Sequence, residues 1–109
     1  MITSVVVSYQ VKPEALPEHI RLIEGVFEQL HRERPDNVEY KVVILDDGVS
    51  FVHVSTADTP DGSNPLPEME SFRLFGKDSA ARVATQPNPT AATVVGSYRP
   101  DVAGWGASM

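Results

Sequence analysis

Hydrophobic and polar residues alternate along four short stretches of the chain, and this period of two predicts β-strands. Two longer stretches place apolar residues every three or four positions, the spacing of an amphipathic helix. We expect strands at residues 2–11, 37–45, 49–56 and 91–98, and helices at residues 14–32 and 65–84. The predicted order of elements is therefore β-α-β-β-α-β.

The first helix has the clearest pattern. Its expected apolar stripe consists of Leu16, Ile20, Ile23, Phe27 and Leu30. Pro13 and Pro17 suit only the start of this helix, where the N–H groups lack partners in any case. His19 and His31 lie near its two ends, about 18 Å apart at 1.5 Å per residue, so they cannot share a metal. We expect both imidazoles to be solvated.

The second half of the chain contains clear turn signals. Asp-Asp-Gly at residues 46–48 predicts a hairpin between the second and third strands. Asn64 is expected to cap the second helix, with Pro65 as its first residue. The sequence Gln-Pro-Asn-Pro at residues 86–89 is expected to end that helix.

The order of elements predicts an α+β, ferredoxin-like fold. Right-handed crossovers give a four-stranded antiparallel sheet, with both helices on one face and the first and third strands in the centre. At 109 residues the chain has room for one domain, which we place at residues 1–99. Residues 100–109 form a short tail that could be ordered only through Trp105.

The strands are apolar on both faces, which two helices on one side do not explain. Val6 opposes Val7 and Val52 opposes Phe51 when side chains alternate across the sheet. The same face of a second copy is the expected cover, which predicts a homodimer through the sheet face.

Composition narrows the classes of partner. The net charge of −6 and the isoelectric point near 4.9 argue against nucleic acid and against anionic membranes. The chain has no cysteine, so it has no disulfide or thiolate site, which fits a cytoplasmic location. Neither paired histidines nor paired carboxylates occur at the spacing of metal ligands, and we expect no metal.

Three segments resemble a known superfamily. They are residues 47–54 (Asp-Gly-Val-Ser-Phe-Val-His-Val), residues 64–66 (Asn-Pro-Leu) with Phe72 and Phe75, and residues 94–99 (Val-Val-Gly-Ser-Tyr-Arg). With the order of elements, they make residues 2–99 similar to the dimeric α/β-barrel superfamily. The most similar branch is the antibiotic-biosynthesis-monooxygenase-like proteins.

This resemblance implies a homodimer and leaves the reaction open, because one fold hosts many functions. The superfamily includes cofactor-free oxygenases that act on polycyclic phenols, quinol oxygenases, haem-degrading enzymes and proteins with no established reaction. We expect a monooxygenase, or a related enolisation or cyclisation enzyme, that needs no cofactor and acts on an aromatic or polyketide-like molecule. The alternative is a non-catalytic homodimeric module that binds a small ligand.

His53 and Tyr9 are the candidate catalytic residues. An imidazole on a central strand could act as a general base, because its pKa lies near the operating pH. The alternative is a histidine that only forms hydrogen bonds in a dimer interface. Tyr9 could orient a substrate oxygen beside His53 if register and face agree, although tyrosines in strands usually serve packing.

A group of large apolar side chains could line a ligand pocket between the sheet and the helices. The candidate ligand-binding residues are Phe51, Met69, Phe72, Phe75 and Tyr98. The alternative is that they form the hydrophobic core.

Overall fold

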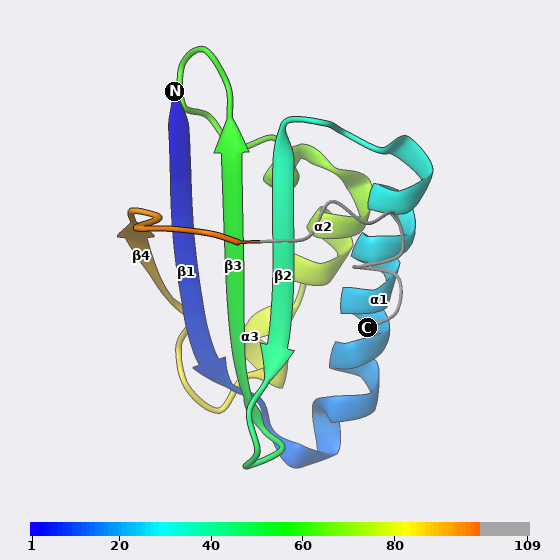
Figure 1. Ribbon diagram of the computed structural model, residues 1–109. Helices are drawn as coiled ribbons and strands as arrows, with labels where there is room; N and C mark the ends of the chain where they lie inside the picture. Colours follow the sequence, from blue (N-terminus) through cyan, green and yellow to red (C-terminus); the bar gives the residue numbers. More distant parts are fainter. Residues whose placement is uncertain (99–109) are drawn as a thin grey trace.

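Four antiparallel strands form one sheet, and the helices lie on one of its faces (Figure 1). The computed structural model describes residues 1–98. Its strands are β1 (Ile2–Gln10), β2 (Val38–Ile44), β3 (Ser50–Asp58) and β4 (Asn88–Ala92). Its helices are α1 (Leu16–Glu33), α2 (Glu70–Gly76) and α3 (Ser79–Arg82), with short 3-10 turns η1 (Pro13–Ala15) and η2 (Leu66–Glu68). The strand order β2-β3-β1-β4 confirms the ferredoxin-like prediction, with β1 and β3 in the centre.

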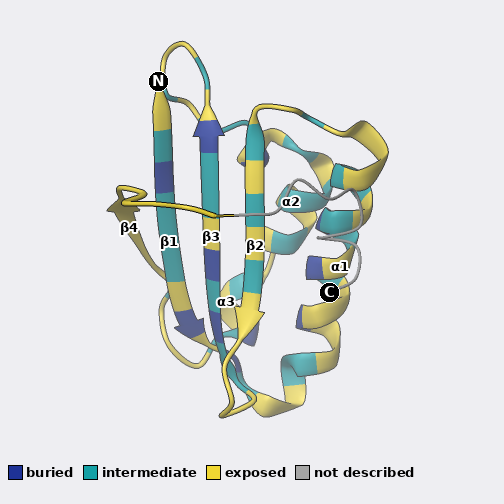
Figure 2. Ribbon diagram, in the orientation of Figure 1, coloured by how far each residue is buried: buried dark blue, intermediate teal, exposed yellow. Residues whose placement is uncertain are grey.

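The pairing of the two central strands decides which residues meet. β1 and β3 are antiparallel, with Val7 opposite His53 and Tyr9 opposite Phe51. Tyr9, Phe51 and His53 are all buried. Figure 2 shows that both β1 and β3 carry buried segments. Tyr9 and Phe51 form the hydrophobic core with Val11 and Ile23.

The buried face of α1 differs from the predicted stripe. His19, Ile23 and Val26 are its buried residues, whereas Ile20 is 40% exposed. The expectation of a solvated His19 is therefore wrong, since only 1% of this residue is exposed. Ile23 is buried as predicted, and Leu16 and Phe27 pack against the core, so the buried face keeps much of the predicted stripe and is rotated to include positions 19 and 26.

The second predicted helix is not continuous. η2 gives way to α2 at Met69, whose backbone is extended, and α2 ends before Lys77, which is also extended. Asp78 then adopts a left-handed conformation, with φ of 60°. Three short pieces therefore replace one helix over residues 65–84, and the break turns α3 back toward the first strand.

The last strand begins earlier than predicted. β4 runs along the edge of the sheet, with Asn88 opposite Ser8 and Pro89 opposite Val7. A proline is tolerated there because an edge strand leaves some N–H groups unpaired. The strand ends before Val94 and Val95, which are exposed, and the chain then passes in front of the sheet (Figure 1).

The face of the sheet opposite the helices keeps some apolar side chains in contact with solvent. Val43 and Val54, on β2 and β3, are 41% and 37% exposed. The predicted tail with Trp105 lies outside the described residues. Within the part of the chain that the structure describes, no helix is long and apolar enough to cross a membrane.

An added methyl group should stabilise the protein at Gly25 and destabilise it at Gly48. A Cβ at Gly25 or at Gly48 would meet nothing within 4 Å, so neither change causes a clash. Gly25→Ala in α1 should raise the free energy of unfolding by about 1 kcal/mol through helix propensity. Gly48→Ala should lower it by about 1–2 kcal/mol, because the turn requires φ of +76°. Urea unfolding of both variants checks the pair, and a stabilised Gly48→Ala protein would contradict the observed hairpin.

Candidate functional site

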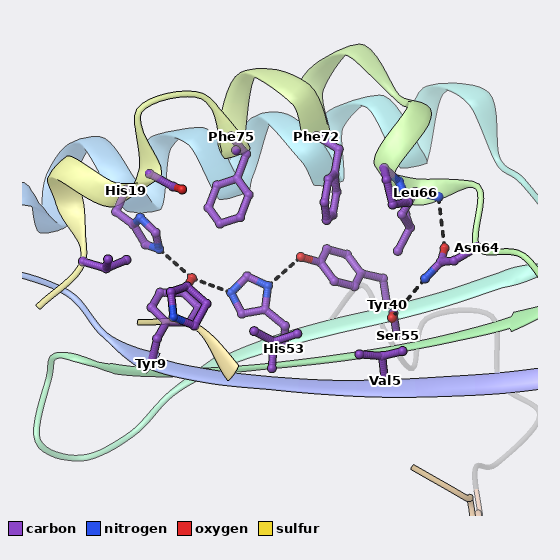
Figure 3. A pocket seen from close by; sticks show the side chains of 16 residues that line it. Val5, Tyr9, His19, Tyr40, His53, Ser55, Asn64, Leu66, Phe72 and Phe75 are labelled. Carbon is purple, nitrogen blue, oxygen red and sulfur yellow. Dashed lines mark hydrogen bonds between the residues drawn. The ribbon is translucent and has the colours of Figure 1, made fainter. Parts of the chain in front are cut away.

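A cavity of about 220 Å³ lies between the sheet and the helical segments η2, α2 and α3. An apolar cavity of about 150 Å³ can hold benzene, so this space suits a molecule of one or two rings. Its apolar wall comes from both sides, with Val5 and Val7 on β1 facing Leu66, Phe72 and Phe75. Figure 3 shows the side chains of Phe72 and Phe75 pointing from the helical side toward the strands.

The polar groups of the cavity form one continuous hydrogen-bonded row (Figure 3). The hydroxyl of Tyr9 lies 2.7 Å from Nε2 of His19 and 2.6 Å from Nε2 of His53. Nδ1 of His53 lies 2.7 Å from the hydroxyl of Tyr40 on β2. The row thus connects α1, β1, β3 and β2.

Arg82 continues this row behind His19. Its Nε–H donates to Nδ1 of His19 at 3.2 Å. The other guanidinium nitrogens donate to the backbone carbonyls of Phe75, in the last turn of α2, and of Lys77, directly after it. Its guanidinium carbon also lies 5.7 Å from the centre of the Phe75 ring. Arg82 is therefore fixed by the break between α2 and α3.

Burial keeps both imidazoles of the row neutral. It lowers the pKa of His53 to about 4, with a further contribution from nearby His19. It lowers the pKa of His19 to about 4 as well, and the positive charge of Arg82 acts in the same direction. Burial also raises the pKa of the Tyr9 and Tyr40 hydroxyls above the ordinary value of tyrosine. The row is thus a chain of uncharged groups that ends at one buried cation.

A second polar group lies on the β3 side of the cavity. Nδ2 of Asn64 donates to the hydroxyl of Ser55 at 3.2 Å, and Oδ1 of Asn64 accepts from the backbone N–H of Leu66 at 3.0 Å. Asn64 therefore connects the start of η2 to β3, and its Oδ1 makes the contact with the first turn that a cap makes, although a short 3-10 turn follows in place of the predicted long helix.

The predicted catalytic pair is brought together. Tyr9 and His53 face the cavity from adjacent strands, within hydrogen-bond distance of each other. Both ring nitrogens of His53 are engaged by tyrosine hydroxyls, Nε2 by Tyr9 and Nδ1 by Tyr40. A direct proton transfer from a ligand to His53 is thus blocked in this arrangement, and its role as a base stays a prediction that must involve the phenols.

The predicted ligand-binding residues divide into two groups. Phe72 and Phe75 line the cavity. Phe51 does not, because it is stacked on Tyr9 in the core, with ring centres 5.8 Å apart. Met69 lies at the start of α2 outside the cavity wall, and Tyr98 is 89% exposed because β4 ends before it.

The sequence interpretation did not assign His19, Tyr40 or Arg82 to the site. For His19 a signal existed, since it lies four residues before Ile23 and therefore on the buried face of the helix. No sequence signal pointed to Arg82, because its side chain would lie at a different place if residues 65–84 formed one continuous helix. Among residues 1–98 no three side chains of the metal-binding types gather into a candidate metal centre.

Neither a protein-family model nor a curated protein matches this chain. Solved structures do. A candidate antibiotic biosynthesis monooxygenase from Nitrosomonas europaea has a TM-score of 0.71 at 17% identity, covering 86% of this chain and 90% of its own. One from Caulobacter crescentus has a TM-score of 0.70 at 15% identity, covering 87% and 91%. Rv0793 from Mycobacterium tuberculosis has a TM-score of 0.73 at 11% identity, covering 91% and 100%.

These likenesses confirm, at the level of fold, the predicted resemblance to the antibiotic-biosynthesis-monooxygenase-like proteins. The chain has the ferredoxin-like fold that these structures share. Identities of this size do not carry over any activity, which must be argued from the site.

Stability should depend on pH through the two buried imidazoles. Their pKa values are about 4 in the folded protein against 6.5 in the unfolded chain, so the unfolded chain binds more protons between these values. The free energy of unfolding should therefore fall as the pH drops from 6.5 toward 4, by on the order of 3 kcal/mol per imidazole. Urea unfolding across this range measures the fall.

Matched variants distinguish the contribution of the two imidazoles to this pH dependence from the contribution of the carboxylates. The dependence of the free energy of unfolding on pH should be weaker in a His19→Gln, His53→Gln double variant. It should be unchanged in His31→Gln, whose side chain is exposed. An unchanged slope in the double variant would mean that the imidazoles do not titrate as described.

Proposed function

We propose that this protein binds a small aromatic or polyketide-like molecule in the cavity and acts on it as a cofactor-independent monooxygenase or a related enolisation or cyclisation enzyme. The observation that carries this proposal is the continuous row of phenols and imidazoles along one wall of an otherwise apolar cavity. Apolar walls with a few convergent polar groups are typical of small-molecule sites. The shared fold agrees with such a function.

The proposed chemistry follows from the division of the cavity wall into an apolar part and a polar row. Phe72 and Phe75 would pack against the rings of the ligand, the phenol of Tyr40 would contact its oxygen, and Tyr9 would orient His53 within the row. An enolate or phenolate is electron-rich enough to react with dioxygen directly. In an oxygenation a ring CH₂ becomes C=O, and dioxygen supplies that oxygen atom and the oxygen of one water molecule.

The alternative is a non-catalytic homodimeric module that binds a small ligand. One observation favours it, namely that neither ring nitrogen of His53 is free to accept a proton directly from a ligand. Binding needs only the cavity and its hydrogen-bonding groups, whereas catalysis also needs a path for a proton.

Oxygen uptake with a panel of hydroquinone- and anthrone-type phenols tests catalysis. We expect uptake by the wild-type protein and at least a tenfold lower rate for His53→Gln, because the glutamine keeps polarity but cannot take up a proton. His31→Gln, at an exposed position of α1, is the matched control and should retain the wild-type rate. Binding of these phenols without uptake by the wild-type protein would favour the binding module.

We also propose a homodimer through the sheet face that the helices leave open, which is supported by the exposed Val43 and Val54. Light scattering should give twice the chain mass of 11.9 kDa. Val54→Lys should yield monomers, because it would bury a charge in the interface. Ile20→Lys, at a similarly exposed position on α1, should leave the dimer intact. A Val54→Lys dimer of wild-type stability would contradict this interface.

A further inference from the structure

The row of hydrogen bonds along the cavity has a direction, and Arg82 determines it. A guanidinium can donate but cannot accept, so Nδ1 of His19 must accept from the Nε–H of Arg82. The single ring proton of neutral His19 therefore sits on Nε2 and is donated to the hydroxyl oxygen of Tyr9. The opposite tautomer would point two N–H groups at each other across 3.2 Å.

The same logic extends along the rest of the row. Tyr9 accepts from His19, and its oxygen could also accept from His53, but the hydrogen of the buried Tyr9 hydroxyl would then have no acceptor among residues 1–98. We therefore infer that the O–H of Tyr9 is donated to Nε2 of His53, which leaves any unpaired hydrogen on the less buried Tyr40. The ring proton of His53 therefore sits on Nδ1 and is donated to the oxygen of Tyr40.

Counting hydrogens shows what remains. The row has four contacts, and Arg82, His19, Tyr9 and His53 supply one hydrogen to each. The hydrogen of the Tyr40 hydroxyl is left over and has no acceptor among residues 1–98. Tyr40 lines the cavity, so this hydrogen is available to a ligand there.

The hydroxyl of Ser55 also has a hydrogen without an acceptor, for a different reason. The backbone N–H of Leu66 donates to Oδ1 of Asn64, which orients the amide so that Nδ2 donates to the Ser55 oxygen. The hydrogen of the Ser55 hydroxyl then has no acceptor within the described part of the chain. Ser55 lines the cavity and lies directly opposite Tyr40 in the pairing of β2 with β3.

We propose that the cavity selects ligands that carry an acceptor oxygen, such as an aryl ketone, a quinone carbonyl or a phenolate, with Tyr40 and Ser55 as the donors. Arg82 is the positioning residue, because it fixes the direction of the row without touching the ligand. This inference rests on the proposed function only in assuming that the cavity holds a small aromatic molecule.

Arg82 is a buried cation whose surroundings hold it in place. The residue is 8% exposed, and no carboxylate forms an ion pair with it among residues 1–98. Its partners are two carbonyls, one imidazole and the face of the Phe75 ring, all of them uncharged. Arg82 lies at the opposite end of the row from Tyr40, so its influence on the ligand passes through the hydrogen bonds of the row.

The tautomers test the direction without any ligand. Nitrogen NMR of the ¹⁵N-labelled protein should show His19 protonated at Nε2 and His53 protonated at Nδ1. In Arg82→Gln the glutamine oxygen can also accept, so the His19 signal should shift toward the other tautomer. Arg73→Gln, at an exposed position of α2, should leave both signals unchanged. The opposite pair of tautomers in the wild-type protein would overturn the proposal.

Selectivity tests the donor at Tyr40. Acetophenone and α-methylstyrene have nearly the same shape, but only the ketone has an acceptor oxygen. Calorimetric titration should show that the wild-type protein binds the ketone about 10- to 100-fold more tightly, because each of the two hydrogen bonds supports a factor of about 3 to 10. Tyr40→Phe should lower this ratio at least threefold, to the factor of about 3 to 10 that Ser55 alone supports. Tyr98→Phe, at an exposed tyrosine, should leave the ratio unchanged.

The outcomes separate this inference from the function on which it rests. Equal binding of both molecules, or a ratio that Tyr40→Phe does not change, would overturn the inference and leave cavity binding intact. Failure of both molecules to bind would overturn the proposed function together with the ligand class. Even then, the tautomers would decide whether Arg82 sets the direction of the row.

Discussion

The hydroxyl of Tyr9, held between two buried imidazoles, is the contact on which the rest of the site depends. It joins β1 to α1 through His19 and to β3 through His53, with distances of 2.7 and 2.6 Å. A buried hydroxyl without partners would cost about 1–3 kcal/mol, and the two imidazoles remove this cost for Tyr9. The same three rings form part of the core and part of the cavity wall, which couples the stability of the fold to the site.

The break between α2 and α3 extends this network to a charge. Arg82 donates to two carbonyls at the end of α2, so the break is stabilised by the residue that it positions. The same side chain reaches His19 and holds its ring proton on Nε2, because Nδ1 must accept from the guanidinium. An irregularity in the helical layer thus controls the hydrogen-bonding character of the cavity on the sheet side.

The solved structures share the fold with this chain at identities of 18% or less for those named as antibiotic biosynthesis monooxygenases. At such distances the arrangement of strands and helices persists while the side chains of the cavity can change completely. The Tyr–His–Tyr–His row must therefore be judged on its own chemistry. That chemistry combines an apolar space for rings with hydroxyl donors, and it leaves no imidazole nitrogen exposed to a ligand.

The sequence by itself determined the order of elements and the ferredoxin-like sheet, because strand and helix periods are local properties of the chain. It also placed Tyr9 and His53 on neighbouring strands, since central strands of this topology must pair. Only the tertiary structure decided that His19 is buried, that Tyr40 completes the row, and that Arg82 ends it. These facts depend on the rotation of α1, the register of β2 and the break after Gly76. Each of them is set by long-range packing, which overrides the local pattern from which a sequence is interpreted.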